Sequence, residues 1–559
     1  YDAYGPGPYG FAGHIVTISD SDFSHNTHDG LTASAEATGE NGRAEQYFTI
    51  QDSNFSNNGR GGFSDFNSAH DGQYNTGYAC SSVQGTAGGC AIVRASATIT
   101  DSTFDDNADT GIYIGTYAKN YGTIYSQAGH GGAPSLYVAG STISGNHYAG
   151  IAMPGSAENR SYLSQTIMID SSTITHNGTD GTGFVAGPTG TMPQGGIIVV
   201  TQSKYQSFNF ENVYVQNSTV SDNKGVGIVL AGQSLGNFVQ FDGLSVENST
   251  VSGNYAGALL ENVSLGSYYT GQKLNTVGST FSDNLASSGF LGPKYNGSGA
   301  AAIMFAESNK YIQQTVSSSD STFSGNYGAG LATYFGGGGN YQTYQDFSST
   351  HDSFAGNGDA GLIASLQVKY GTTPANYNAH QTVHLAGSTF SALSATDGAR
   401  ISAYSDNALT TQLIYVYNDA AGHANSFTGG DVGLNIYGTT ADDGTLATTL
   451  QAENAKFDSS YVGLQFIQVG DAYNPTAQIG IYANTFTGHT IDGISVLGRD
   501  ATQTLAIQGN TFVNPVGTYG ISVISQNTTT QAINVHTNTQ TGGTYYYFND
   551  AGFSQTITY

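Results

Sequence analysis

A short phrase built from serine, one apolar residue and asparagine returns along nearly the whole chain. Residues 141–146 read STISGN, residues 218–223 read STVSDN and residues 321–326 read STFSGN, and each is followed four residues later by glycine and an aliphatic residue. A repeat of tens of residues is typical of a solenoid, in which each repeat packs only against its neighbours. The repeat therefore overrides the usual expectation that 559 residues form several globular domains.

The apolar residue of each phrase gives a register for the whole chain. Neighbouring anchors are as little as 26 residues apart, at Phe486 and Phe512, and the longer intervals contain loops. We expect fifteen anchors to form the structural core: Phe23, Phe55, Phe104, Ile143, Ile174, Val220, Val251, Phe281, Phe323, Phe354, Phe390, Phe427, Phe457, Phe486 and Phe512.

Each repeat contains three short apolar pieces, as at residues 213–215, 218–220 and 228–230. Alternation over so few residues predicts strands, not helices. A piece this short cannot bury a face alone, but equivalent pieces stacked about 4.8 Å apart would form continuous apolar columns inside a coil. The sequence therefore predicts an all-β parallel solenoid of about 15–16 coils with long intercoil loops, which would form a rod.

The asparagine that closes the phrase suits a corner between two strands. Asparagine tolerates the left-handed backbone region, and its side chain bonds neighbouring backbone groups. We expect these residues to form an internal structural ladder: Asn26, Asn58, Asn107, Asn146, Asn177, Asn223, Asn254, Asn284, Asn326 and Asn357.

The repeated phrase resembles that of the right-handed parallel β-helices of the pectin-lyase-like superfamily, from about residue 12 to residue 540. In character the chain is most similar to the β-helices of bacterial autotransporter passengers and surface adhesins. The resemblance implies a right-handed parallel β-helix. It does not select a function, because this scaffold carries lyases, hydrolases, epimerases and inert stalks alike.

The corner pattern changes near residue 390. Leu393 stands where the ladder would continue, and asparagine moves ahead of the anchor at Asn425, Asn484 and Asn510. We therefore expect one elongated body in two parts: residues 1–390 with asparagine-ladder coils, and residues 391–559, a continuing β-helix with altered corners.

Composition points to an extracellular protein of the bacterial cell surface. Charged residues make up 10% of the chain, whereas Gly and Tyr number 77 and 38. The net charge of −26 disfavours binding to nucleic acid or to an anionic membrane surface, and no apolar stretch is long enough to cross a membrane. Cys80 and Cys90 in one loop predict a local disulfide in an oxidising compartment, with free thiols as the alternative.

Neither end of the sequence shows a capping helix, and uncapped solenoid ends invite pairing with another chain. The sequence is therefore either a piece of a longer chain or a subunit that associates end to end into a fibre. Lateral partners would be glycans or other surface proteins, contacted by loop tyrosines such as Tyr268 and Tyr341.

The enzymatic alternative depends on Asp105, Asp106 and His130. An aspartate pair followed by Gly-His-Gly resembles polygalacturonase-like β-helix hydrolases, in which paired carboxylates act as acid and base. The rest of that pattern is missing, since no Asn-Thr-Asp precedes the pair and the nearest Arg-Ile-Lys equivalent begins at Arg400, eight coils away. Asp106 also occupies the turn position that Gly145 and Asp222 fill elsewhere, so a turn role is favoured.

Motifs for other chemistry are weak. Residues 232–236 match a Gly-x-Ser-x-Gly elbow outside its strand-to-helix context, and His25, His28 and Asp29 form a single polar turn, so we assign no catalytic residue, no metal ligand and no cofactor. Two aspartate-containing turns, 356–359 and 441–444, remain candidate sites for a structural Ca²⁺ ion. The first hypothesis is a non-catalytic structural or adhesive rod; the alternative is a lyase, hydrolase or epimerase that acts on polysaccharides.

Overall fold

The structure is a computed structural model that describes residues 2–5, 10–39, 41–71, 90–125, 134–179, 184–187, 190–285, 297–369, 378–471, 475–513, 519–541, 544–551 and 554–558. The chain divides into two compact units. Unit 1 comprises residues 1–275 and 284–297, and unit 2 comprises residues 276–283 and 298–559. The expected change of corner pattern near residue 390 therefore lies inside unit 2.

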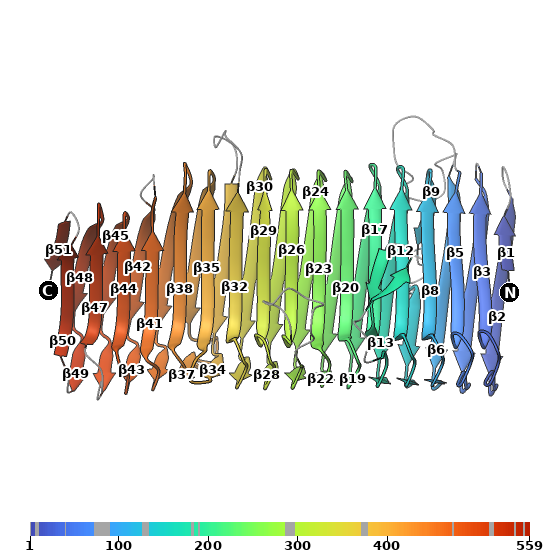
Figure 1. Ribbon diagram of the computed structural model, residues 1–559, viewed down its shortest axis with the longest axis horizontal. Coiled ribbons are helices and arrows are strands. Elements are labelled where there is room, and N and C mark those ends of the chain that lie inside the picture. The colour runs from blue at the N-terminus through green and yellow to red at the C-terminus, as the bar shows by residue number, and fades with distance from the viewer. Residues whose placement is uncertain are drawn as a thin grey trace. The chain divides into compact units, whose positions relative to one another are not determined.

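Unit 1 is built of three parallel sheets whose strands lie side by side in chain order (Figure 1). The first sheet contains β1 Asp2–Gly5, β3 Leu31–Thr38, β5 Phe63–His70, β8 Thr110–Lys119, β12 Ala149–Glu158, β17 Gly195–Lys204, β20 Val226–Leu235 and β23 Ala256–Leu265. The second contains β2 Phe11–Ser19, β4 Arg43–Gln51, β6 Ala91–Thr100, β9 Gly122–Tyr125, β10 Leu136–Ala139, β13 Tyr162–Asp170, β18 Phe208–Gln216, β21 Val239–Glu247 and β24 Tyr269–Val277, whose last two residues belong to unit 2.

The third sheet of unit 1 carries the anchors. It contains β7 Thr103–Asp105, β11 Thr142–Ser144, β14 Thr173–Thr175, β19 Thr219–Ser221 and β22 Thr250–Ser252. Ile143 lies opposite both Phe104 and Ile174 in the parallel register, so the anchors stack as the repeat predicts. A separate antiparallel hairpin is formed by β15 Phe184–Gly187 and β16 Gly190–Pro193.

Unit 2 repeats the same three sheets. Its first sheet contains β26 Ala300–Glu307, β29 Leu331–Gly338, β32 Ala360–Lys369, β35 Asp397–Asp406, β38 Val432–Ala441, β41 Val462–Val469, β44 Asp492–Arg499, β47 Tyr519–Gln526 and β50 Thr544–Ala551. Its second contains β27 Tyr311–Ser319, β30 Gln342–Thr350, β33 Asn378–Ala386, β36 Leu409–Tyr417, β39 Thr445–Glu453, β42 Thr476–Tyr482, β45 Thr502–Gln508, β48 Thr530–His536 and β51 Ser554–Thr558. Its third contains β25 Thr280–Ser282, β28 Thr322–Ser324, β31 Ser353–Ala355, β34 Thr389–Ala392, β37 Ser426–Gly429, β40 Lys456–Asp458, β43 Thr485–Thr487, β46 Thr511–Val513 and β49 Thr539–Thr541.

The predicted all-β parallel solenoid is confirmed, but the strands of two sheets are longer than predicted. The three-residue pieces expected at 213–215 and 228–230 lie within β18 and β20, which extend over nine and ten residues. The expectation was wrong because it stopped at the short apolar runs. Outside those pieces the strands continue through mixed residues: along β18 the polar Asn209 and Glu211 are buried, whereas Phe208 and Phe210 are partly exposed.

The core is not made of apolar columns alone. Fourteen of the fifteen anchors are buried, and only Phe23 in the first coil is partly exposed. Inside unit 2, however, the side chains of Gln314, Gln345, Gln381 and Gln412 form a buried amide ladder with N···O distances of 2.7 to 2.8 Å. Amides stacked at the coil spacing satisfy one another, so a polar column is tolerated inside the coil.

Among the described residues, no helix is long and apolar enough to cross a membrane.

Candidate functional site

In most of the described coils the chain turns sharply before the anchor strand, and one left-handed residue makes that turn. In unit 2 the successive residues at this corner are Asp320, His351 and Gly387, with φ values of 53°, 56° and 62°. Aspartate, glycine and histidine all adopt this backbone region more readily than most other residues do. His351 therefore fits the backbone of the corner, and its ring projects from the corner between β30 and β31.

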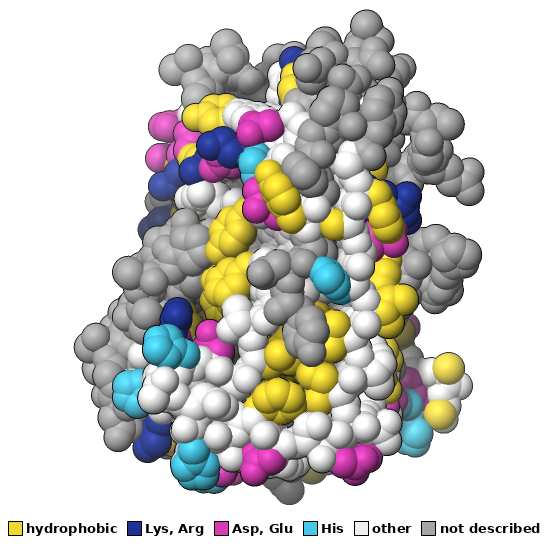
Figure 2. All heavy atoms as spheres, turned by 90° about the vertical axis from the view of Figure 1, so that its right-hand side faces the viewer, with side chains coloured by type: hydrophobic (Ala, Val, Ile, Leu, Met, Phe, Trp, Pro, Cys, Tyr) yellow, Lys and Arg dark blue, Asp and Glu magenta, His cyan; other side chains and the backbone are white. Residues whose placement is uncertain are grey.

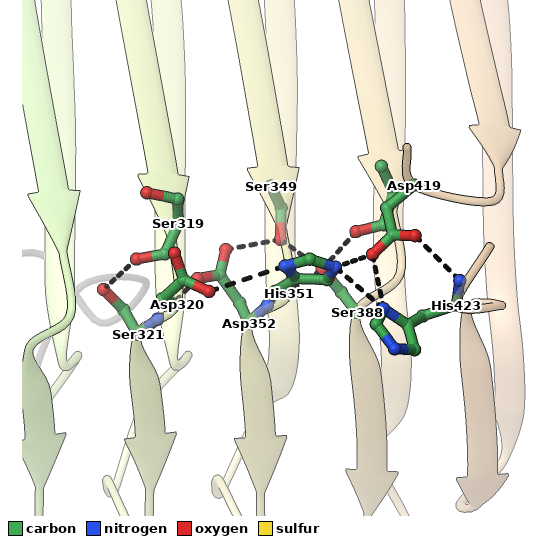
Figure 3. Close-up of polar contacts among 10 residues, drawn as sticks. Ser319, Asp320, Ser321, Ser349, His351, Asp352, Ser388, Asp419 and His423 are labelled. Carbon is green, nitrogen blue, oxygen red and sulfur yellow. Dashed lines mark hydrogen bonds and ion pairs between the residues drawn. The ribbon is translucent and has the colours of Figure 1, made fainter. Parts of the chain in front are cut away.

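The next coil replaces the single corner residue by a longer loop, residues 418–424, between β36 and β37. The loop is closed by its own backbone, since Gly422 N donates to Asp419 O at 3.0 Å and Asp419 N donates to His423 O at 3.1 Å. His423 N also donates to Asp419 Oδ1 at 2.7 Å. The second oxygen of Asp419 and the ring of His423 are thereby held toward His351 (Figure 3).

Three side chains converge at this corner. Asp419 Oδ2 contacts His351 Nε2 and lies 2.7 Å from His423 Nδ1, and the two imidazole nitrogens are 3.2 Å apart. The side chain of Asp419 is only 3% exposed, whereas that of His423 is 66% exposed. This His–Asp–His cluster is the one group of its kind among the described residues that could hold a metal ion.

The electrostatics of the cluster favour an ionised carboxylate. Burial acts to raise the pKa of Asp419, but the hydrogen bonds from His423 and the nearby imidazoles outweigh it, so the pKa is lowered. On the far side of His351, Asp320 Oδ1 lies 3.5 Å from Nδ1. A carboxylate thus faces each nitrogen of the His351 ring.

A second candidate site is a recess in unit 1, at the corners that lead from the first sheet into the second. The recess has a volume of about 480 Å³ and is lined by Asn120, Tyr121, Asn159, Arg160, Tyr205, Gln206 and Gly236. Arg160 Nε donates to Gln206 Oε1 at 2.8 Å, and Nη1 donates to the hydroxyl of Tyr121 at 3.4 Å. The guanidinium is therefore held between a tyrosine and an amide, while the Tyr205 side chain is 65% exposed.

Aromatic side chains continue from this recess onto the outer face of the second sheet. Tyr162 and Phe208 begin β13 and β18, two residues after the recess corners, and their ring centroids are 6.5 Å apart. Phe210 lies 5.8 Å from Tyr162, and Phe238, which is 40% exposed, lies 5.4 Å from Phe208. The recess and the aromatic rings together form the aromatic flank of unit 1.

The residues of the enzymatic alternative occupy structural positions where they are described. Asp105 ends β7 and accepts a hydrogen bond of 2.5 Å from the Ser144 hydroxyl. Asp106 is exposed and adopts φ of 51°, the turn conformation that Gly145 shares at 65°. His130 lies outside the described residues. Arg400, the remote arginine, pairs with Asp359 and Asp397 at 3.1 and 2.9 Å.

The asparagines of the phrase are joined along the coil axis within each unit. Asn146, for example, donates from Nδ2 to Phe104 O at 3.0 Å and to Asn177 Oδ1 at 2.8 Å. Every member from Asn58 to Asn357 is buried, whereas Asn26 in the first coil is exposed.

Beyond residue 390 a different corner carries the asparagines. Leu393 is 49% exposed, and Asn484 N donates to Asn510 Oδ1 at 2.9 Å, ahead of the anchor. In earlier coils serines hold that corner, as where Ser102 N donates to Ser141 Oγ at 3.1 Å.

The remaining sequence candidates do not form a metal cluster among the described residues. In the polar turn, Asp29 accepts a hydrogen bond of 2.7 Å from Gly61 N. Of the turns considered for Ca²⁺, Asp359 is paired with Arg400. Cys90 is buried and disulfide-bonded, while Cys80 lies outside the described residues, so their pairing stays a prediction.

Sequence reasoning missed the His–Asp–His cluster because 68 residues separate His351 from Asp419, and only the stacking of coils brings them together. Two signals were available. Histidine, a metal-ligating residue type, stands at a left-handed corner between those of Asp320 and Gly387, and the segment between β36 and the anchor Phe427 is longer than in the other described coils.

Comparison with known families supports the fold. A family model described as "Right handed beta helix region" matches residues 94–284. No curated protein matches the chain. The match, together with the parallel stacked sheets, shows that the chain is a right-handed parallel β-helix.

Proposed function

We propose that this chain is a non-catalytic extracellular scaffold of the bacterial cell surface that binds saccharides on the aromatic flank of unit 1. The observation that carries the proposal is the recess lined by Tyr121, Arg160 and Tyr205. It lies beside the aromatic side chains at the start of β13 and β18. Tyrosine and phenylalanine rings offer flat apolar area to the face of a sugar, and the guanidinium and amides offer hydrogen bonds to its hydroxyls.

A β-helix suits this role because each strand inside a sheet is hydrogen-bonded to a neighbouring strand on both sides, which keeps the backbone rigid. The recess corners are fixed by coil-to-coil bonds: Arg160 N donates to Tyr205 O at 3.0 Å, and Gln206 N donates to Gly236 O at 2.8 Å. A site on such corners is already ordered before the ligand arrives, so little conformational entropy is lost on binding.

Charge favours neutral saccharides as the ligand class. The chain carries −26 overall, which repels polyanions at long range, and Arg160 is the one guanidinium that the described residues bring to the recess. The low content of charged residues and the disulfide-bonded Cys90 support an extracellular location.

The test is affinity electrophoresis of the full chain in gels that contain neutral polysaccharides, with acidic polysaccharides run alongside. We expect retardation by a neutral polysaccharide that is lost in Tyr205→Asn and in Arg160→Asn, since asparagine keeps the left-handed corner and removes the ring or the guanidinium. Tyr327→Asn is the matched control, because Tyr327 is also 65% exposed but lies in unit 2. Equal migration of the wild type and Tyr205→Asn in every gel would contradict the proposal.

Association between copies is the second part of the proposal. Two large apolar side chains of β2 are exposed, Phe11 by 64% and Ile15 by 83%. Figure 2 shows hydrophobic side chains gathered in the middle of one face, with acidic and histidine side chains along its lower margin. Exposed apolar surface of this kind favours packing against another chain. Sedimentation velocity over a hundred-fold concentration range should show growth of the sedimenting species, and a constant value would contradict self-association.

A further inference from the structure

We propose that His351, Asp419 and His423 of unit 2 bind one divalent transition-metal ion of the Zn²⁺ class. The proposal is independent of the saccharide site, which lies in unit 1. It depends on the geometry of three donor atoms, on the space kept for them and on the residue behind His351.

The donor atoms already point at one another. One donor atom from each side chain lies within 4.8 Å of the other two: Asp419 Oδ2, His351 Nε2 and His423 Nδ1. The two imidazole nitrogens are 3.2 Å apart. Asp419 Oδ1 is occupied by the backbone N–H of His423, so only Oδ2 faces the imidazoles. Three lone-pair donors gathered this closely are held together when they share a cation.

Gly387 keeps the space for the cluster. This residue is the corner of the coil between His351 and the loop 418–424, and a Cβ there would meet His351 Cδ2 at 2.8 Å and Asp419 Oδ2 at 3.0 Å. Any side chain at position 387 would therefore push into the donor set. The glycine lets His351 reach across one coil to the carboxylate of the next.

Asp320 orients the His351 ring. Its Oδ1 lies 3.5 Å from Nδ1, on the side opposite the cluster, so a proton on Nδ1 leaves the lone pair of Nε2 aimed at the cluster (Figure 3). A carboxylate behind a ligating imidazole is the usual arrangement in protein metal sites, where it fixes the tautomer and makes the ligand more basic.

The ligand types select the metal. Two imidazole nitrogens with one carboxylate oxygen suit Zn²⁺, Co²⁺ or Ni²⁺, whereas Ca²⁺ and Mg²⁺ prefer oxygen ligands alone. Three protein ligands leave at least one coordination position, and the 66% exposure of His423 places that position toward solvent. The ion would fasten the loop 418–424 to the coil of His351.

The test uses the full chain, stripped of metal with a chelator and then titrated with Co²⁺, which reports its own coordination in the visible spectrum. We expect one equivalent to bind with the absorption of a four-coordinate ion, Zn²⁺ to displace it, and Ca²⁺ to leave the spectrum unchanged. Zn²⁺ should also raise the midpoint of thermal unfolding, because an ion that binds only the folded state stabilises it.

Substitution of the proposed ligands tests whether they form the metal site. His351→Asn and His423→Asn should lose the absorption, and Asp320→Asn, which removes only the orienting carboxylate, should weaken Co²⁺ binding by about 10–100-fold. His176→Asn is the matched control, since His176 of unit 1 has φ of 57° at an exposed corner and no role in the cluster. Circular dichroism checks that each variant folds. Because the His423 side chain is mostly exposed, we expect His423→Asn to fold, so that a loss of Co²⁺ binding in this variant reports on the site itself.

The proposal is overturned if the wild-type chain binds no Co²⁺, or if His351→Asn and His423→Asn bind it as tightly as His176→Asn does. Either result would mean that the three side chains hold one another by hydrogen bonds alone.

Discussion

Glu211 and Asp242 lie directly opposite each other on β18 and β21, with both side chains fully buried inside the coil of unit 1. Burial raises the pKa of Asp242 to about 7. Burial, together with the nearby charge of Asp242, raises the pKa of Glu211 well above its usual range. Gly232 leaves room for this pair, because a Cβ there would crowd the Asp242 carboxyl.

This pair predicts that unit 1 loses stability as the pH rises. In the unfolded chain both carboxyls ionise near pH 4, so between about pH 4 and pH 7 the folded state binds more protons. The free energy of unfolding must therefore fall across that window, by about 1.4 kcal/mol for each unit of pKa difference.

The double variant Glu211→Gln with Asp242→Asn should flatten this dependence, because amides do not titrate. We expect its unfolding midpoint in urea to change less between pH 5 and pH 8 than that of the wild type, and to be higher at pH 8. Asp222→Asn, an exposed turn acid of the same unit, serves as control. A double variant with the wild-type pH dependence would contradict the assignment.

Removal of one ladder asparagine should destabilise unit 1 strongly. In Asn146→Ala, Phe104 O and Asn177 Oδ1 lose their donor, and Asn107 Nδ2 loses its acceptor at 2.8 Å. Each buried polar group left without a partner costs about 1–3 kcal/mol, so we expect a loss of at least about 2 kcal/mol. The loss of unfolding free energy is measured by denaturant unfolding, with Thr142→Ala at an exposed position of the same coil as control. Equal losses of unfolding free energy in the two variants would contradict a structural ladder.

The aromatic column of unit 2 predicts a large cavity effect. Phe323 stacks between Phe281 and Phe354, with ring centroids 5.0 Å away on both sides. Phe323→Ala should lower the unfolding free energy by about 3–5 kcal/mol, whereas Phe323→Leu should cost less because it leaves a smaller void. A loss below about 1 kcal/mol in Phe323→Ala would mean that the column does not support the coil.

Asp106 tests the choice between a turn and a catalytic carboxylate. Because its φ is positive and equivalent corners hold Gly145 and Gly253, Asp106→Gly should leave stability within about 0.5 kcal/mol of the wild type. Saccharide retardation should also be unchanged. Loss of a polysaccharide-cleaving activity in this variant would instead support the enzymatic alternative.

The sequence predicted the elements that recur and missed those that occur once. The register of Phe104, Ile143 and Ile174 could be read from the repeat, because each coil must present the same apolar position to the same column. The movement of asparagine to Asn484 and Asn510 was also visible, since the residues themselves change places relative to the anchor.

The candidate sites could not be predicted in this way. His351 meets Asp419 only because Gly387 leaves the intervening corner empty, and Arg160 meets Tyr121 only because two corners stack. Such contacts depend on the coil order and on loop conformation, neither of which produces a sequence spacing that recurs. The buried pair Glu211 and Asp242 was missed for a related reason: strand alternation marks inward positions, but acidic residues are usually assigned to the outside.

The most direct test of the account is to measure binding and turnover on one sample. The full chain is incubated for days with the neutral polysaccharide that retards it, and with acidic polysaccharides, while new reducing ends and unsaturated products are assayed. A scaffold predicts that the polysaccharide stays bound and intact, with product no greater than in Tyr205→Asn. Steady release of product by the wild type, lost on substitution in the recess, would show instead that the aromatic flank is an active site.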